Sequence, residues 1–276
     1  MRVQVRFSTL LVFLLLILPY QTSPQSHILT EQKIFDQFNP PVFEDITIKE
    51  GLPQNTVLCI LQDYLGYLWI GTEYGLVQYD GYSMKVFQPE EYKSNSISNS
   101  SVLIIYEDKN KTLWIGTDGG LNKFDRVNES FKSYRYNPDD STSINSDYIS
   151  CIYEDKAGRF WIGTNKGLNK FDRDREIFTR YHFINRDLGS SSSPTQNKYN
   201  LSIKTIIEDP VSEDLLLGTG MMGLWKFNIK EKIFLKYKFI SDSLFDKEIG
   251  FIQSFHKARD GKIWIASIHS LSRLDP

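Results

Sequence analysis

Acidic side chains and histidines are the residues of this chain that could carry out catalysis or bind a metal. Three Glu-Asp pairs begin at Glu107, Glu154 and Glu208, and paired carboxylates are the acid and base of many glycosidases. These pairs recur at one place in a repeat, however, which favours a turn signal over catalysis. The four histidines, at positions 27, 182, 256 and 269, show no zinc-binding spacing. We therefore expect no catalytic residue, no metal site and no cofactor.

The two cysteines, Cys59 and Cys151, occupy the same slot of the repeat, two repeats apart. A disulfide needs Cα atoms within about 7 Å of each other, a condition that equivalent slots of separate repeats rarely meet. We therefore expect two buried free thiols without a catalytic role.

A twelve-residue phrase recurs along the chain and must position any functional side chain. It reads WIGTEYGLVQYD from Trp69, WIGTDGGLNKFD from Trp114 and WIGTNKGLNKFD from Trp161, with degenerate copies at Leu216 and Trp264. The copies are 45, 47, 55 and 48 residues apart, close to the period of propeller blades. Each tryptophan is expected to fill the space between neighbouring blades. The glycine two residues later is expected to allow close packing or an unusual backbone angle.

Each copy lies among four short runs rich in Ile, Val, Tyr, Phe and Trp. In the third unit they begin at Ile149, Phe160, Gly167 and Phe178. Short runs at this spacing, without a helical period, predict antiparallel strands. One such sheet cannot bury both of its apolar faces, so neighbouring sheets must stack around an axis. The sequence thus predicts an all-β fold, a β-propeller of four-stranded antiparallel blades with five repeat units.

The two ends of the repeat region leave the size of the ring open. The segment 42–48, VFEDITI, reads as the fourth strand of a blade, whereas the last unit ends after its third strand at Asp275. A shared blade could therefore close a five-blade ring, and a partial arc of a larger propeller has the same strand count. An aspartate ends the third strand at Asp80, Asp125, Asp172 and Asp275, where an Asx turn can cap the chain.

Charge and composition exclude some partners. The 276 residues include 32 Lys and Arg and 34 Asp and Glu, which gives a net charge of −2. That balance argues against a nucleic-acid partner or a polybasic membrane contact.

The amino terminus has the pattern of a secretory signal. Arg2 and Arg6 precede the apolar run LLVFLLLIL at 10–18, which is too short for a membrane span and suits a signal. We expect a signal peptide at 1–26, a linker at 27–41 and the propeller at 42–276, in the periplasm or secreted. An uncleaved amino-terminal anchor is the alternative.

The segment EDKAGRFWIGTNKGLNKFD, Glu154 to Asp172, resembles the two-component regulator propeller repeat, and the resemblance extends over about residues 42–276. It implies a periplasmic sensor that detects a ligand, often an oligosaccharide released from a polysaccharide. It also implies a downstream β-sandwich, membrane helix, histidine kinase and receiver, which have no counterpart in this sequence. The family tends to use two propellers of seven blades, whereas five units are visible here. A truncated sensor, a split gene product and a free-standing binding protein are all compatible with this pattern.

Variable turns inside a uniform scaffold are the expected place for a binding site. The turns between second and third strands contain Glu73, Tyr74, Asp118, Asn165, Lys166, Met221 and His269. In propellers these turns share a face with the loops between units. Those loops are polar here and contain Tyr92, Asn99, Asp147, Tyr148 and Tyr199. Polar groups there could hydrogen-bond sugar hydroxyls while tyrosine rings stack on apolar sugar faces.

We predict a non-catalytic, exported propeller that binds a small-molecule ligand, an oligosaccharide, within a two-component system. A kinase-bearing subunit or missing downstream domains would be its partner. Two other interpretations stay open. An enzyme on a propeller scaffold, such as a lyase or glycosidase, would need acids or histidines that converge in the channel. A protein-interaction scaffold would form a stable complex with a separate kinase.

Overall fold

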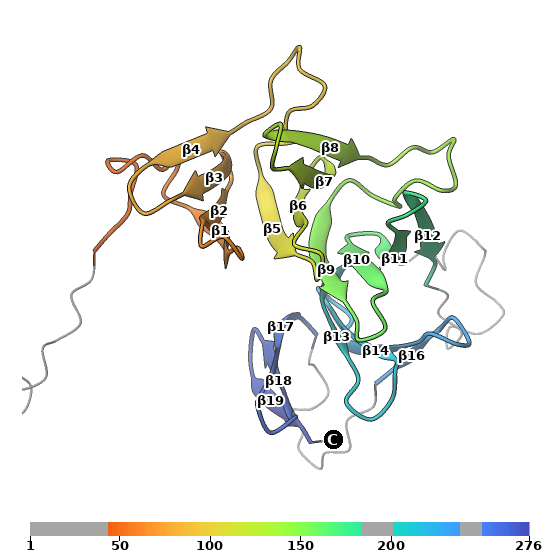
Figure 1. Ribbon diagram of the computed structural model, residues 1–276. Helices are drawn as coiled ribbons and strands as arrows, with labels where there is room; N and C mark the ends of the chain where they lie inside the picture. The colour runs from red at the N-terminus through yellow and green to blue at the C-terminus, as the bar shows by residue number, and fades with distance from the viewer. Residues whose placement is uncertain (1–43, 184–200, 238–249, 276) are drawn as a thin grey trace, which may run out of the picture. The chain divides into compact units, whose positions relative to one another are not determined.

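The computed structural model describes residues 44–183, 201–237 and 250–275 (Figure 1). The chain divides into two units, 1–45 and 46–276, and all the strands described below belong to the second. The expected signal or anchor at 1–26 and the linker at 27–41 lie outside the described residues. Within the described ranges, no helix has the length and apolar character needed to span a membrane.

Nineteen strands in the described residues form five antiparallel sheets, one for each repeat unit. Blade 1 contains β1 (Val57–Gln62), β2 (Leu68–Thr72), β3 (Gly75–Tyr79) and β4 (Met84–Phe87). Blade 2 contains β5 (Val102–Glu107), β6 (Leu113–Thr117), β7 (Gly120–Asp125) and β8 (Ser130–Tyr134). Blade 3 contains β9 (Ile149–Glu154), β10 (Phe160–Thr164), β11 (Gly167–Asp172) and β12 (Ile177–Tyr181). Blade 4 contains β13 (Ile203–Glu208), β14 (Leu215–Thr219), β15 (Leu224–Asn228) and β16 (Ile233–Lys236), and blade 5 contains β17 (Ile252–Lys257), β18 (Ile263–Ser267) and β19 (Leu271–Leu274).

The five sheets are the blades of a five-blade β-propeller and follow one another around a common centre (Figure 1). The first strand of each blade contacts the first strand of the next, from β1 and β5 through to β13 and β17. The predicted all-β propeller is confirmed. As the sequence indicates, the last sheet has three strands in the described part of the chain.

The described part of the segment 42–48 is not the fourth strand that the sequence analysis predicts. Its described part, 44–48, contains no strand and leads into a turn. The backbone amide and the hydroxyl of Thr47 donate to the Glu50 carboxylate at 2.7 and 2.6 Å, and Gly51 adopts a φ of 114°. These local bonds turn the chain, because a side-chain acceptor three residues ahead competes with extended backbone.

The first strand of every blade carries a β-bulge that the sequence did not predict. In blade 1 the register against β2 shifts between Val57 and Cys59, and the other four blades shift at the equivalent place. A bulge bends a strand and increases its twist. It therefore shapes a strand that contacts the first strands of the neighbouring blades.

Neighbouring blades approach each other closely at the glycine of the repeated phrase. A Cβ at Gly71, Gly116, Gly163 or Gly218 would lie 2.6–2.8 Å from a side-chain atom of the next blade. The atoms in the way belong to fully buried residues that begin the next first strand, namely Val102, Ile149, Ile203 and Ile252. The expected close packing at this glycine is confirmed.

The conserved spacing between Asp and Trp in the repeat also has a structural cause. Asp63 accepts a hydrogen bond from the Trp69 indole at 2.8 Å and one from Arg126 at 2.6 Å. Arg126 follows the third strand of blade 2 and also donates to Glu107 of its own blade at 3.1 Å. We call this set of contacts the Asp–Trp–Arg clamp. Asp108, Trp114, Arg173 and Glu154 repeat it at the next junction.

The clamp explains the Glu-Asp pairs. The Asp also closes the turn between the first two strands, because its other oxygen accepts backbone amides at 2.9 Å from Asn110 and Thr112 in blade 2. The pairs are therefore turn signals and junction contacts. The same aspartate in blade 3, Asp155, binds the Trp161 indole but takes its arginine, Arg159, from its own blade.

Candidate functional site

The turns between second and third strands lie at the same end of the blades as the loops that lead into the first strands. The Ser98 hydroxyl, in the loop before β5, lies 2.8 Å from the Thr117 hydroxyl at the end of β6. The amide of Asp118 donates to the carbonyl of Ser101 at 3.2 Å. We call this end of the propeller the loop face. It comprises the turns 73–74, 118–119, 165–166, 220–222 and 268–270 and the loops 88–101 and 135–148.

The threonine of the repeated phrase holds the turn on the loop face in blades 1 to 3. In blades 1 to 3 the threonine hydroxyl donates to the carbonyl of the second glycine at 2.9–3.1 Å. That glycine has a φ between 126° and 134° at Gly75, Gly120 and Gly167, a conformation that favours glycine. The turn backbone is thus fixed, and only the two residues between threonine and glycine vary.

Two buried asparagines anchor the loops to the blades, and the sequence analysis missed them. Asn122 accepts the amide of Ser98 at 2.9 Å and donates to the Ser98 hydroxyl at 2.8 Å. Asn169 accepts the backbone amide of Asn145 in the next loop at 3.1 Å and donates to the side-chain oxygen of Asn145 at 2.9 Å. The recurring asparagine of GLNKFD was the available signal, because a polar residue in a buried strand needs a partner.

The predicted turn residues are all exposed on the loop face. They are Glu73, Tyr74, Asp118, Asn165, Lys166, Met221 and His269. Tyr74 and Met221 are 61% and 88% exposed. Their exposure is compatible with ligand contact, although Asn165 also accepts a hydrogen bond from the Ser146 hydroxyl at 2.6 Å.

The structure brings the predicted loop and turn residues together blade by blade. In blade 2, Asn99 lies against the turn at 118–119, since a Cβ on Gly119 would be 2.8 Å from the Asn99 Cβ. In blade 1, Gln54 donates to Glu73 at 3.2 Å and Gln88 donates to the carbonyl of Tyr74 at 2.6 Å.

Blade 3 carries the densest group. The Lys166 ammonium lies 5.0 Å from the centroid of the Tyr136 ring, and Asp147 accepts the amide of Tyr136 at 2.6 Å. Tyr148 lies under the Lys204 ammonium, at 5.4 Å. Cations this close to aromatic rings are attracted to the ring face. Tyr136 and Lys204 therefore join the predicted residues as members of the candidate site.

Three of the predicted residues stand apart from these groups. Tyr92 is 95% exposed in the loop before blade 2. The only contact of His269 in the described residues is its backbone amide, which donates to the Ser267 hydroxyl at 3.3 Å. Tyr199 lies outside the described residues.

Groups that could support metal or thiol chemistry do not gather in the described part of the chain. Among those residues, no three of His, Cys, Asp and Glu are placed to hold a metal ion. Cys59 and Cys151 are free, as predicted, and burial raises the pKa of both thiols to about 12. Both are therefore protonated, and poor nucleophiles, at neutral pH.

The family model described as the two component regulator propeller matches residues 51–74, 96–119 and 143–166. Each match runs from the loop before a first strand to the turn after a second strand, in blades 1, 2 and 3. The matched segments therefore contain the Asp and Trp of the clamp and part of the loop face.

Several known proteins are similar to this chain. Histidine kinase P4 of Formosa agariphila is 42% identical over 57 residues, which cover 21% of this chain and 4% of that protein. The extracellular domain of the putative hybrid two component system BT3049 from B. thetaiotaomicron has a TM-score of 0.69 at 25% identity, over 84% of this chain and 30% of that one. The β-propeller domain of Cps50 (Swd1) from Myceliophteria thermophila has a TM-score of 0.51 at 13% identity, over 77% of this chain and 62% of its own, and shares the fold alone.

The chain spans less than a third of the extracellular domain that it resembles. Three segments of the chain thus match the two component regulator propeller repeat, and its fold is similar to that of the extracellular domain of a two component system.

Proposed function

We propose that this propeller is the exported, non-catalytic sensor part of a two-component system and that its loop face binds an oligosaccharide. The likeness to an extracellular domain of a two component system supports export and signalling. The observation that carries the binding proposal is the contrast on the loop face, where two exposed residues per turn vary while the threonine and glycine around them repeat.

The side chains of the loop face suit a sugar. A pyranose offers apolar ring faces and many hydroxyls, so its sites combine aromatic planes with amides and carboxylates. Tyr74 supplies an exposed ring in blade 1 and Tyr136 a half-exposed one beside blade 3. Asn99, in the loop before blade 2, and Asn165, in the turn of blade 3, supply amides. An oligosaccharide, with several rings, can contact more than one blade at once.

Ligand binding would signal by favouring one arrangement of the blades. A ligand shifts an equilibrium only by its difference in affinity for the two states. A chain of sugars that contacts two blades has such a difference if the blades move against each other. A kinase-bearing subunit or further domains would read the change.

Calorimetric titration with a panel of neutral and uronate-containing oligosaccharides tests the binding proposal. We expect saturable binding of at least one member, and weaker binding of it by Tyr74→Ala and Asn165→Ala. Tyr82→Ala is the matched control, because Tyr82 is 98% exposed but lies in the turn between β3 and β4, at the other end of the blade. Absence of binding across the panel would reject the oligosaccharide.

The signalling part has its own test. In the producing cell, deletion of the gene should abolish the transcriptional response to the oligosaccharide that binds. A response that survives deletion would separate binding from signalling.

A further inference from the structure

The loop before blade 2 and the loop before blade 3 are built alike. In the first loop the amide of Lys93 donates to the carbonyl of Glu90, and the amide of Ser96 donates to that of Lys93, at 3.1 and 3.0 Å. The Ser96 hydroxyl accepts the amide of Glu90, and the carbonyl of Asn95 accepts the amide of Phe131. The same four bonds recur in the second loop, at positions 47 residues later. The two loops therefore present equivalent carbonyl groups.

In the second loop an arginine uses these carbonyls. Arg180, on β12, donates to the carbonyls of Ser143, Asp140 and Asn137 at 2.7, 2.6 and 3.2 Å. It also donates to the Ser143 hydroxyl at 2.5 Å. The planar donors of a guanidinium match several acceptors at once. We call the three carbonyls that surround it the carbonyl cradle.

The cradle of the first loop has no arginine of its own. Its carbonyls belong to Glu90, Lys93 and Ser96, and the position equivalent to Arg180 is Ser133 on β8. The Ser133 hydroxyl is bonded to Asn122 at 2.8 Å. Among the described residues, no side chain donates to the three carbonyls. Each carbonyl oxygen has two lone pairs, so at least one acceptor position on each stays available.

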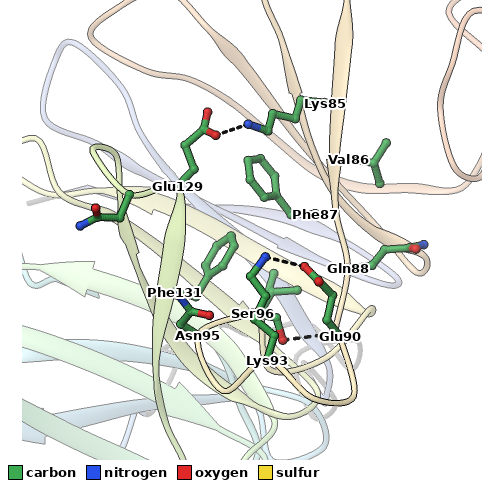
Figure 2. A pocket seen from close by; sticks show the side chains of 12 residues that line it. Lys85, Val86, Phe87, Gln88, Glu90, Lys93, Asn95, Ser96, Glu129 and Phe131 are labelled. Atoms are coloured by element: carbon green, nitrogen blue, oxygen red, sulfur yellow. Dashed lines mark hydrogen bonds and ion pairs between the residues drawn. The ribbon is translucent and has the colours of Figure 1, made fainter.

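A cavity lies beside this cradle. Its volume is about 430 Å³, and the residues of the cradle line it together with Phe87, Ile97 and Phe131 (Figure 2). Two ion pairs, Lys93–Glu90 and Lys85–Glu129, stand at its edge (Figure 2). All four charged side chains are about half exposed, so solvent screens these pairs and they hold each other weakly.

We propose that this cavity binds a guanidinium group. The carbonyl cradle supplies acceptors with the arrangement that already binds one guanidinium in this chain. The Phe87 ring that lines the cavity already lies 5.4 Å from the Lys85 ammonium, and aromatic rings of this kind attract cations. The cavity is larger than a guanidinium, so the rest of the ligand has room within it. The group can belong to a free guanidino compound or to an arginine of a partner protein. This inference does not rest on oligosaccharide binding at the loop face.

Amide NMR titrations of the whole chain test the proposal, with methylguanidinium and the blocked peptide acetyl-Gly-Arg-Gly-amide as the two probes. We expect saturable shifts of the amides at 90–97, and smaller ones with methylammonium, which has the charge without the planar donors. Shifts with methylguanidinium alone indicate a free compound, and shifts with the peptide alone indicate a protein partner. Absence of saturable shifts with both probes overturns the proposal.

Ser133 offers a matched pair of variants. Ser133→Arg places in blade 2 the side chain that blade 3 already uses, so it should abolish the shifts and raise the melting temperature. Ser133→Ala loses the same bond to Asn122 without adding a guanidinium, so it should still bind the probes. Equal probe binding by both variants would overturn the proposal.

The reverse exchange keeps the test valid if Ser133→Arg fails to fold. Arg180→Ser removes the guanidinium from the second cradle and should lower the melting temperature. Methylguanidinium should then restore part of the loss, whereas methylammonium at the same concentration should not. Equal effects of the two cations would show that the cradle does not select a guanidinium.

Discussion

At the scale of single residues, an aspartate buried beside a tryptophan indole is the recurring contact of this fold. Burial on its own would raise the pKa of Asp63, but hydrogen bonds from Trp69 and Arg126 outweigh it and hold the pKa below its ordinary value. The pKa of Asp209 in blade 4 is also lowered, because a bond from Lys226 outweighs the effect of burial. These carboxylates are therefore charged partners in the folded protein.

Acid should weaken the protein through these groups. A carboxyl whose pKa is lower in the folded than in the unfolded chain adds to the free energy of unfolding above the unfolded pKa, about 4. That contribution is lost as the pH falls through the folded pKa. We expect the free energy of unfolding, measured with urea, to fall as the pH is lowered below about 5. Asp63→Asn should show a smaller fall, and an equal fall would contradict this role.

Loss of the acceptor itself should be costly. Asp108→Ala leaves the Trp114 indole and Arg173 without their shared partner, and breaking a buried ion pair costs about 3 kcal/mol or more. Urea denaturation followed by circular dichroism measures the change. Asp118→Ala, on the exposed loop face, is the control and should stay within about 0.5 kcal/mol. Similar losses in the two variants would show that the clamp carries little stability.

At the scale of the strand and turn, the repeat predicted most of what the structure contains. The strands around Trp161, the glycine packing and the aspartate turns were readable because each copy shows the same residues at the same offsets. The bulges were not readable, since a bulge is a register between two strands. The fourth strand predicted at 42–48 is absent from its described part, 44–48, because the bond between Thr47 and Glu50 turns the chain there.

The candidate site was only half predictable. The exposed turn residues followed from variation within a repeat, whereas Tyr136 and Lys204 enter the site through contacts between neighbouring blades. Arg126 and Arg173 follow FD in two units, but nothing local shows that their partners lie in the preceding blade. Contacts across a junction depend on the stacking of the blades, and one unit read alone does not contain it.

The glycine at the junction should tolerate no side chain. In Gly163→Ala the new Cβ would lie 2.4 Å from the Cys151 sulfur and 2.8 Å from Ile203, and overpacking of this kind costs about 1–3 kcal/mol. Thermal unfolding followed by circular dichroism would show the loss. Gly220→Ala is the control, because its nearest neighbour is the flexible end of Lys204 at 3.4 Å. A Gly163→Ala protein as stable as Gly220→Ala would refute close packing at this site.

At the scale of the whole molecule, the blades differ in exposure, although the same sequence pattern recurs in them. Val57 and Ile60 of β1 are 45% and 63% exposed, whereas the equivalent Val102 and Ile105 of β5 are 0% and 4% exposed. The exposed fractions differ because blade 1 covers these side chains of β5, whereas no described blade covers those of β1 in the same way. Sequence alone gives no sign of this difference, since Ile occupies both slots.

Position in the ring should therefore decide the effect of one substitution. Ile105→Lys buries an unpaired charge at the junction and should cost about 3 kcal/mol or more. Ile60→Lys, in the same slot of blade 1, keeps its ammonium in water and should change the free energy of unfolding by about 0.5 kcal/mol at most. Urea denaturation of the two variants measures both. Equal losses would mean that another body covers β1 in solution.

The placement of the tryptophans makes each blade optically distinct. Trp69, Trp114 and Trp161 are fully buried against carboxylates, Trp225 donates to a backbone carbonyl, and Trp264 is partly exposed. Each blade contains one indole, so a variant in which four of the five tryptophans are replaced by phenylalanine has a single fluorescent indole, in one known blade. The fluorescence of such a set would report separately on how each blade opens, closes or responds to a ligand.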